Sequence, residues 1–322
     1  MRPFNLIVIA NPNDRHLAVL EQLPDSTTIT VGKTMEAFTN AAEEADVILN
    51  CMGVGGTLRE LWPTAKNVKW VHSLSAGVES VLFPELIESK VPVTNSRGVF
   101  KDSLGEFAVA SILYFAKDLR RMMRNQMAQR WEQFDVEMID RQTVGIVGYG
   151  EIGKAAATRA RALGMKVLAT RRRPDQMKDD PIVSRAYQVE DRAELMAASD
   201  YIVVATPLTP ETRGIVAEKE LRAMKNTGVI INLGRGPTID EPSLIRALQE
   251  GWIRGAALDV FDVEPLPPGH PFWTLENVLL SPHCADHTSD WLESAMRFFV
   301  GNFERFVEGA PLQNLVDKRA GY

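Results

Sequence analysis

The chain of 322 residues has very few cysteines and no long apolar run, and these shortages exclude several protein classes. Cys51 and Cys284 are the only cysteines, so neither a disulfide framework nor a cysteine-ligated zinc site is expected. The first apolar segment, FNLIVIA from Phe4, is too short for a signal-peptide core or a membrane span. We therefore expect a cytoplasmic protein that binds no metal and does not enter a membrane.

Basic residues are outnumbered by acidic ones, 36 against 42. The formal net charge is −6, and the sequence has no long basic patch with interleaved aromatic residues. This balance argues against nucleic acid as a partner. With 45% apolar and 24% charged residues, the composition is that of a globular protein, and the length suits about two domains.

Strand-like and helix-like segments alternate along the first hundred residues, and this first unit ends near Gly98. This alternation predicts an open parallel sheet with helices packed on it. Strands are predicted at residues 4–9, 27–31, 46–51, 68–72 and 91–94, with helices at 14–23, 35–45, 58–66 and 78–89.

Residues 102–127 contain no proline and only one internal glycine, Gly105, which predicts one long helix that bridges two domains. After it, Trp131, Phe134 and Met138 are interspersed among arginines and acids. Two interpretations remain open: a solvated charged face, or an arm that packs on another subunit.

A glycine-rich motif organises the second half. The segment TVGIVGYGEIG from Thr143 reads as a buried strand followed by Gly148, Gly150 and Gly153, and a breaker-free helical stretch then runs to Gly164. The first glycine permits a tight turn, the second lets backbone approach a pyrophosphate, and the third lets helix and strand pack closely. We expect a dinucleotide-binding loop whose cofactor contacts are Gly148, Tyr149, Gly150, Glu151, Ile152 and Gly153.

A second alternating series follows this motif, so the second half also predicts a parallel α/β sheet. A helical, half-buried tail is predicted from Thr288 to Glu308. The predicted strands are residues 166–170, 201–206, 229–233, 255–260 and 278–280, and the helices are 190–198, 218–224 and 241–249.

A basic cluster stands where dinucleotide sites usually offer an acid to the ribose 2′-hydroxyl. The strand KVLAT runs directly into Arg171, Arg172 and Arg173. A carboxylate there would repel a 2′-phosphate, whereas an arginine can bind one bidentately. The cluster therefore predicts NADP(H) as the cofactor, with NADPH preferred over NADH; the alternative is an exposed basic turn without a ligand.

Three other strand ends carry groups capable of chemistry: Arg235 in INLGRG, Glu264 in ALDVFDVEP and His283 in LLSPHCAD. Ligands of doubly wound sheets bind at the carboxyl ends of the strands, so these groups can converge on one site. A cation and a proton donor suit the reduction of a ketone, whose oxygen gains negative charge. His16, His72, His270 and His287 are interpreted as structural.

The sequence resembles the D-isomer-specific 2-hydroxyacid dehydrogenase family. The resemblance rests on SLSAGVESV, VTNSRGVF, TVGIVGYGEIGKAAA, ATPLTPET, INLGRGPTID, GAALDVFDVEP and LLSPHCADHT, in the family's order. It implies an α/β protein with two doubly wound parallel-sheet domains. A Rossmann NAD(P)-binding domain, residues 101–286, would be inserted into a flavodoxin-like substrate domain made of residues 1–100 and the tail 287–322.

The resemblance also implies residue roles. Arg235 would bind the substrate carboxylate and polarise the keto oxygen, His283 would protonate that oxygen, and Glu264 would orient His283. The backbone N–H groups of Ala76 and Gly77 would hold the carboxylate as well. Further implied roles are a nicotinamide carboxamide contact for Asp259, a place along the cofactor cleft for Thr206 and Pro207, and a homodimer contact within residues 107–138.

The expected function is NADPH-dependent reduction of small 2-ketoacids, with glyoxylate and hydroxypyruvate as leading substrates, to D-2-hydroxyacids. A reductase for bulkier substrates such as phenylpyruvate is an alternative, with pocket size set near Met52, Leu74, Trp291 and Met296. A dinucleotide-sensing, corepressor-like binding protein is another, although no disordered extension is visible. Asp286 and His287 replace the family's usual small residues; Asp286 either tunes His283 or caps the tail helix.

Overall fold

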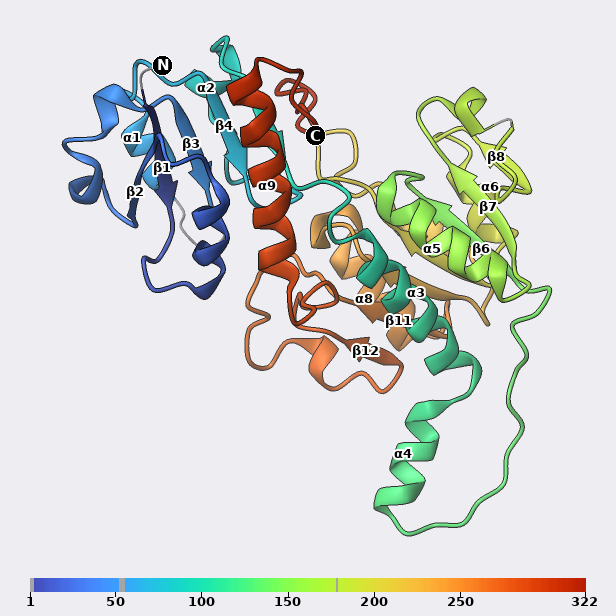
Figure 1. Cartoon of the computed structure of the whole chain (residues 1–322). Helices are drawn as coiled ribbons and strands as arrows, with labels where there is room; N and C mark the ends of the chain where they lie inside the picture. The colour runs from blue at the N-terminus through green and yellow to red at the C-terminus, as the bar shows by residue number, and fades with distance from the viewer. Residues whose placement is uncertain (1–2, 52–55, 178) are drawn as a thin grey trace. The chain divides into compact units, whose positions relative to one another are not determined.

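The computed structural model describes residues 3–51, 56–177 and 179–322 (Figure 1). The chain divides into two compact units. The first unit comprises Met1–Phe100 and Thr288–Tyr322, and the second comprises Lys101–His287. The second unit is thus inserted within the first, as the resemblance implied.

The first unit contains a sheet of five parallel strands in the order β2-β1-β3-β4-β5. Most positions of its central strands are buried, because helices cover both faces. The chain reverses its winding direction between β1 and β3, as in a flavodoxin-like sheet. The strands are β1 (Phe4–Ile9), β2 (Thr27–Gly32), β3 (Val47–Asn50), β4 (Trp70–Ser73) and β5 (Val93–Asn95).

The long tail helix α9 (Trp291–Glu308) completes the first unit by packing on its sheet (Figure 1). The ring of Trp70 in β4 stacks on Phe299 of α9 with the ring centroids 5.3 Å apart. After α9, Lys318 Nζ donates hydrogen bonds to the backbone oxygens of Leu86, Ser89 and Val91. These contacts attach the C-terminal segment to residues 86–91 of the same unit.

Several helices predicted in the first unit are wrong in type or length. Residues 14–23 form a 3₁₀ helix, η1 (Arg15–Gln22), and residues 35–45 form two short ones, η2 (Met35–Phe38) and η3 (Ala42–Glu44). Thr39 Oγ1 bonds to the Glu36 carbonyl, a local alternative to helical pairing. In the predicted helix 78–89, Pro84 has no backbone N–H to donate to a carbonyl of the preceding turn, so only α2 (Pro84–Glu88) forms. The remaining helix, α1 (Thr57–Leu61), is shorter than predicted.

The second unit contains seven parallel strands in the order β12-β11-β10-β9-β6-β7-β8. The order reverses between β6 and β9, which is the topological switch point of a Rossmann sheet. Nearly every position of the central strands is buried. The strands are β6 (Thr143–Val147), β7 (Lys166–Thr170), β8 (Arg185–Tyr187), β9 (Tyr201–Val204), β10 (Val229–Asn232), β11 (Gly255–Leu258) and β12 (Val278–Leu280). The short β8 was not predicted.

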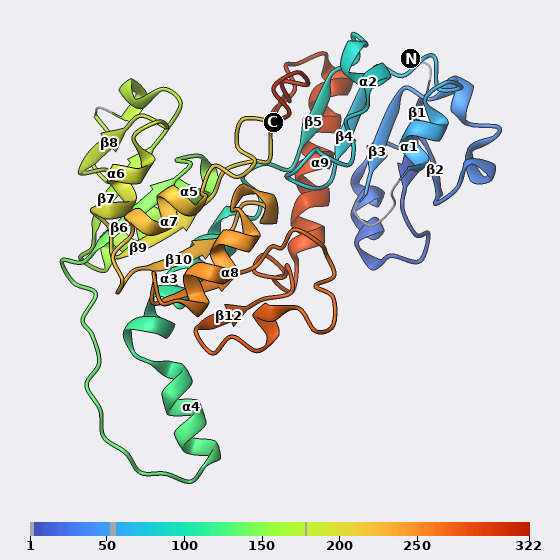
Figure 2. The same cartoon turned by 180° about the vertical axis from the view of Figure 1, so that it is seen from behind.

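Helices cover both faces of this sheet. One face carries α3 (Lys101–Ala116) and α5 (Glu151–Ala162), and the other carries α6 (Arg192–Ala197), α7 (Glu218–Ala223) and α8 (Glu241–Gln249) (Figure 2). A Cβ on Gly105 would lie 3.0 Å from the Ala155 backbone, so this glycine lets α3 approach α5 closely. No helix within the described ranges is long and apolar enough to span a bilayer.

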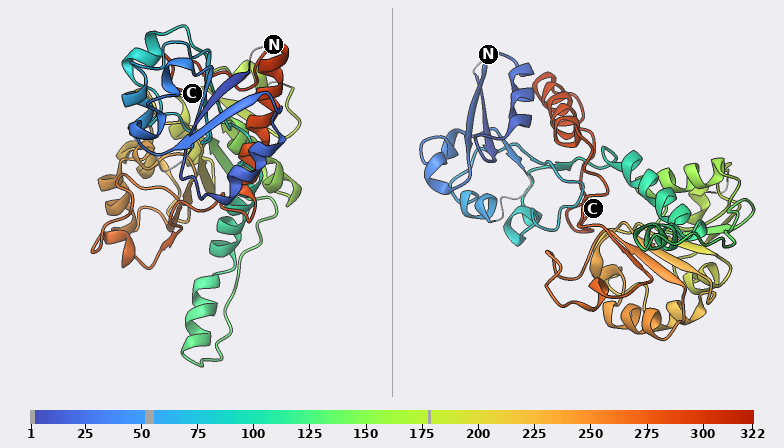
Figure 3. Two further views of the ribbon diagram at one scale, coloured as in Figure 1. Left: turned by 60° about the vertical axis from the view of Figure 1, so that its left-hand side comes forward. Right: turned by 90° about the horizontal axis from the view of Figure 1, so that it is seen from below.

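The single long helix predicted over residues 102–127 is instead broken into α3 and α4 (Leu119–Met127). Asp118 interrupts it with a left-handed φ of +47°, and its carboxylate accepts a hydrogen bond from Arg121 N as the cap of α4. Helix α4 and the segment 128–140 extend away from the sheet of their unit (Figure 3). We call residues 119–140 the arm.

Candidate active site

Three neighbouring parallel strands of the second unit end at one edge of the sheet and deliver the predicted catalytic groups there. Arg235 follows β10, Glu264 lies in the loop after β11, and His283 follows β12. Parallel strands present their carboxyl ends on the same side, so groups far apart in sequence converge. The expectation that they share one sheet edge is met.

His283 and Glu264 form a direct pair. His283 Nδ1 lies 2.7 Å from Glu264 Oε2, and the other carboxylate oxygen, Oε1, accepts a hydrogen bond from Phe261 N at 2.9 Å. The imidazole is therefore oriented by its Nδ1–H bond, which leaves Nε2 to face a ligand. His283 also has a left-handed φ of +53°, a strained backbone of the kind found at functional sites.

The contact between His283 and Glu264 raises the pKa of the first and lowers that of the second, so it favours the charged form of each. The hydrogen bond to Glu264 raises the pKa of His283 above 6.5; burial and the Arg235 charge oppose this, and Asp259 supports it. Burial raises the pKa of Glu264, but the bonds from His283 and Phe261 N and the nearby positive charges outweigh it, so the net shift is downward. The arrangement therefore favours an imidazolium next to a carboxylate.

Arg235 is held in place by hydrogen bonds within its own turn. Its carbonyl oxygen accepts hydrogen bonds from Asn232 Nδ2 at 3.1 Å and Thr238 Oγ1 at 2.6 Å. Its Nη1 donates to the Gly234 carbonyl at 2.8 Å. Because the Arg235 charge acts on the pKa of both Glu264 and His283, the guanidinium belongs to the same electrostatic cluster.

Asp259 is buried at the end of β11 and supports the loop that carries His283. Its Oδ1 accepts hydrogen bonds from Ser281 Oγ at 2.5 Å and from the backbone N–H groups of Cys284 and Ala285, each at 3.0 Å. Burial raises its pKa, although these bonds and the His283 charge work against that shift. Sequence reasoning assigned Asp259 only a cofactor contact and missed this supporting role; Oδ2 is not used by the three bonds.

The glycine loop has the form that a dinucleotide requires. Gly148 has φ +99°, and a Cβ on Gly153 would lie 2.2 Å from the Gly148 carbonyl, so a tight turn and close packing need both glycines. A Cβ on Gly150 would meet nothing within 4 Å, which leaves open space before the N-terminus of α5. No described side chain caps that helix end, so its N–H groups are available to an anion. These residues fit a bound dinucleotide.

Thr206 lies at the switch point itself, just after β9. A Cβ on Gly148 would lie 2.7 Å from Thr206 Cγ2, and one on Gly234 would lie 2.5 Å from the Thr206 carbonyl. Its Oγ1 is buried without a hydrogen-bond partner in the part of the chain described. Pro207 follows and accepts a hydrogen bond from Thr212 Oγ1 at its carbonyl. Thr206 therefore stands between the glycine loop and the strand end that carries Arg235.

The basic turn, Arg171–Arg173, follows β7 directly, and its side chains are half-buried or exposed. The structure adds an acid that sequence reasoning missed. Asp180 accepts a hydrogen bond from Tyr149 Oη at 3.1 Å, and Lys154 Nζ lies 3.7 Å from the same oxygen. Burial and Asp180 together raise the pKa of Tyr149, while the Arg171 charge lowers it. No local pattern in the sequence connected Asp180 with the glycine loop.

In the first unit, Ala76 and Gly77 follow β4. Their carbonyl groups accept hydrogen bonds from Asn95 Nδ2 and Ser75 Oγ respectively, each at 2.6 Å, so this turn has a defined backbone conformation. Of the residues expected to set pocket size, Leu74 and Met296 are buried and Met52 lies outside the described residues. Trp291 lines a cavity of about 460 Å³ together with Arg15, His16, Cys51 and neighbouring residues.

The other histidines differ from His283. His72 is fully buried, bonds to Thr94 Oγ1 at 2.7 Å, and has its pKa lowered to about 3 by burial. Asp286 Oδ1 lies 3.7 Å from His287 Nε2. Helix α9 begins after Asp290, so the N-cap position of the tail helix is held by Asp290 and not by Asp286. Among the described residues, no group of three or more His, Cys, Asp or Glu side chains could hold a metal ion.

Comparisons with known proteins agree with this geometry. Residues 109–285, more than half of the chain, match the model of the D-isomer specific 2-hydroxyacid dehydrogenase NAD-binding domain. A glyoxylate reductase from Thermofilum pendens is 34% identical over 80% of this chain and 78% of its own.

Two crystal structures superpose with a TM-score of 0.85 and cover 99% of this chain and 100% of their own. One is a D-isomer specific 2-hydroxyacid dehydrogenase from Xanthobacter autotrophicus Py2 in complex with NADPH and MES, 30% identical. The other is an NADPH-dependent glyoxylate/hydroxypyruvate reductase from Sinorhizobium meliloti in complex with NADP and sulfate, 27% identical. The chain belongs to the D-isomer specific 2-hydroxyacid dehydrogenase family and is an NAD(P)-dependent enzyme of that family.

Proposed function

We propose that the protein reduces small 2-ketoacids such as glyoxylate and hydroxypyruvate to D-2-hydroxyacids with NADPH. The observation that carries the proposal is the His283–Glu264 pair beside Arg235. An imidazolium and a guanidinium at one sheet edge suit a carbonyl oxygen that gains negative charge. Similarity to a glyoxylate reductase and to a glyoxylate/hydroxypyruvate reductase supports the substrate class.

Each residue of the proposed site has a separate role in the reduction. The guanidinium of Arg235 binds the substrate carboxylate and stabilises the developing charge, and the N–H groups of Ala76 and Gly77 add donors to the carboxylate. His283 Nδ1–H remains bonded to Glu264, so the proton on Nε2 is the one given to the keto oxygen. The bound cofactor would supply the hydride, and Asp259 would hold the carboxamide of its nicotinamide. After proton transfer His283 is neutral and still held by Glu264.

NADPH is the proposed cofactor because three arginines follow β7. A 2′-phosphate can accept bidentate hydrogen bonds from a guanidinium, and no carboxylate precedes the cluster on the strand. The glycine loop with Glu151 and Ile152 at the start of α5 holds the pyrophosphate. Thr206 and Pro207 would line the cofactor site next to it.

We also propose a homodimer in which the arm supplies the contact. Within the arm, Arg121 pairs with Glu132 at 2.6 Å and lies 4.3 Å from the centre of the Phe134 ring, so the segment is internally ordered. Met127 and Trp131 are nevertheless 86% and 96% exposed. Apolar side chains gathered on a protruding segment favour burial against another chain.

Sedimentation should show a dimer at micromolar concentration for the parent protein and a monomer for the double variant Trp131→Glu, Met127→Lys. A monomeric parent protein would contradict the proposed dimer.

One assay tests the proposal as a whole. The oxidation of NADPH and of NADH is followed with glyoxylate, hydroxypyruvate, phenylpyruvate and a branched 2-ketoacid. We expect the highest kcat/KM for glyoxylate or hydroxypyruvate with NADPH. Preference for phenylpyruvate would indicate the bulkier substrate class. Absence of turnover with every ketoacid, together with tight dinucleotide binding, would replace the reductase by a dinucleotide-sensing binding protein.

A further inference from the structure

A second carboxylate–histidine pair lies outside the proposed catalytic group. Glu241, the first residue of α8, and His270, just before the 3₁₀ helix η6 (Pro271–Trp273), contact one another with Oε1 and Nε2 3.0 Å apart. Both side chains are largely buried, with exposed fractions of 18% and 13%. His270 Nδ1 accepts a hydrogen bond from Phe272 N, so the ring proton lies on Nε2 and is donated to Glu241.

The second oxygen of Glu241 reaches the loop that carries Glu264. Glu241 Oε2 accepts a hydrogen bond from Asp262 N at 3.4 Å. The preceding N–H, that of Phe261, donates to Glu264 Oε1 at 2.9 Å. Two successive backbone N–H groups are therefore held by two carboxylates, one structural and one proposed to be catalytic. A displacement of this backbone would move the donor that orients Glu264.

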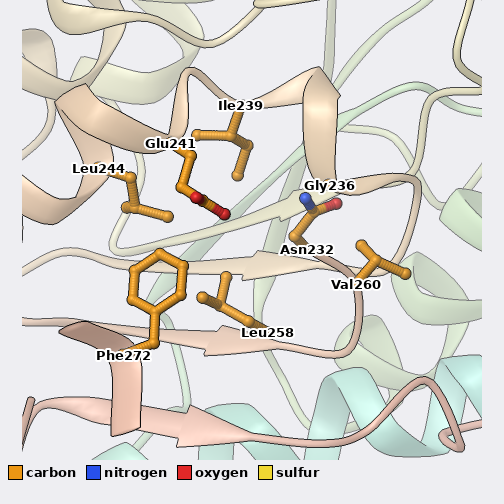
Figure 4. A pocket seen from close by; sticks show the side chains of 8 residues that line it. All are labelled: Asn232, Gly236, Ile239, Glu241, Leu244, Leu258, Val260 and Phe272. Carbon is orange, nitrogen blue, oxygen red and sulfur yellow. The ribbon is translucent and has the colours of Figure 1, made fainter. Parts of the chain in front are cut away.

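The same stretch of backbone contacts the turn that carries Arg235. A Cβ on Gly236 would lie 1.9 Å from the carbonyl carbon of Phe261 and 2.5 Å from Asp262 N, so the two backbones are in direct contact. Figure 4 shows the Glu241 carboxylate directed past Ile239 toward Gly236 and Asn232, above Leu258. The space between these residues is only about 10 Å³, so the carboxylate has little room to move.

We propose that Glu241 and His270 are positioning residues which fix the backbone at Phe261 and Asp262 and thereby keep Glu264 aligned on His283. The pair acts through the loop and touches no substrate. The expected fall in kcat rests on the proposed function, whereas the expected change in the titration of the His283 imidazole does not. His283 is faced by Glu264, Asp259 and Arg235, so a loss of Glu264 alignment leaves the Arg235 charge less opposed.

Two variants test the pair. Glu241→Gln leaves one oxygen acceptor and turns an amide NH₂ toward one of two donors, so it breaks one of the two contacts. His270→Asn removes the ring donor without altering Glu241, and it serves if Glu241→Gln does not fold. His270→Gln keeps a terminal amide that can donate to Glu241 and should restore most of the lost function. Glu218→Gln is the matched control, because Glu218 also pairs with basic residues, Arg222 and Arg246, on the α7–α8 layer.

The decisive readout is the pKa of His283, followed by NMR as a function of pH in the full-length protein without substrate. We expect it to fall in Glu241→Gln and His270→Asn and to stay unchanged in Glu218→Gln. Ketoacid reduction should lose roughly 10-fold in kcat, less than the cost of a full ångström of misplacement, while the Kd for NADPH is retained. An unchanged His283 pKa and kcat in either folded variant would overturn the proposal. If the parent protein reduces no 2-ketoacid, the proposed function fails, but the pKa comparison still decides the role of this pair.

Discussion

The sheet edge that carries Arg235, Glu264 and His283, which we call the catalytic edge, and the basic turn of the second unit are built in different ways. At the catalytic edge, each group is held by several contacts: Arg235 by Asn232 and Thr238, and the His283 loop by Asp259. At the basic turn, Arg172 and Arg173 are exposed and follow the last residue of β7. The first region fixes angles and distances, whereas the second presents charge.

This difference indicates where function depends on geometry and where it depends on composition. A general acid must reach its substrate within hydrogen-bond distance, so the catalytic edge tolerates little displacement. Recognition of a phosphate by exposed arginines depends mainly on the charge and the bidentate donor pair that each guanidinium carries, and a flexible exposed side chain can bring these to the ligand. Substitutions at the catalytic edge should therefore reduce turnover, whereas substitutions at the basic turn should change which cofactor is used.

The largest expected effect is that of His283→Ala at the catalytic edge. Removal of the proposed proton donor should lower kcat by about 10²–10⁴-fold, the usual contribution of general acid catalysis, without loss of NADPH binding. Steady-state kinetics with glyoxylate and a fluorescence titration with NADPH measure the two quantities. Near-normal kcat of this variant with every active 2-ketoacid would show that the proton comes from another group.

The next effect is that of Arg235→Lys, which keeps the charge and removes the bidentate fork. We expect KM for the ketoacid to rise and kcat to fall, because the proposed role of Arg235 is both to bind the carboxylate and to stabilise the developing charge. The combined loss in kcat/KM should be on the order of 10–10²-fold, as for charge-assisted hydrogen bonds. A change in KM alone would limit Arg235 to substrate binding. Combined with His283→Ala, its loss should be less than additive.

A smaller and different effect is expected at the basic turn. Arg171→Asp should lower kcat/KM with NADPH by about 10-fold or more and raise that with NADH, because a carboxylate repels a 2′-phosphate. Turnover at saturating cofactor should change little, which distinguishes this region from the catalytic edge. Equal or better catalytic efficiency with NADH in the parent protein would contradict the role of the arginines.

The sequence predicted the features that depend on local pattern. The apolar strands, the glycine loop and the positions of Arg235, Glu264 and His283 after strands followed from residue type and order. The break at Asp118 did not, because a single polar residue in a helical pattern gives no sign of a left-handed conformation. The same holds for contacts across long sequence distances, such as Asp180 with Tyr149 and Asp259 with Ala285. These depend on tertiary packing that no short segment encodes.

The pH dependence of kcat in the parent protein and in Glu264→Gln tests the central claim most directly. The claim is that Glu264 keeps His283 protonated as the acid of the reaction. Glu264 raises the pKa of His283 above 6.5, and only the protonated form donates, so activity is lost as the pH rises through that raised pKa. Glu264→Gln removes the charge and leaves one oxygen for two donors, so its NH₂ faces either His283 Nδ1–H or Phe261 N–H. In either orientation His283 loses the carboxylate charge that raises its pKa, so the loss of activity should begin at lower pH, with a smaller change under acidic conditions. Profiles that coincide on the alkaline side would contradict the account.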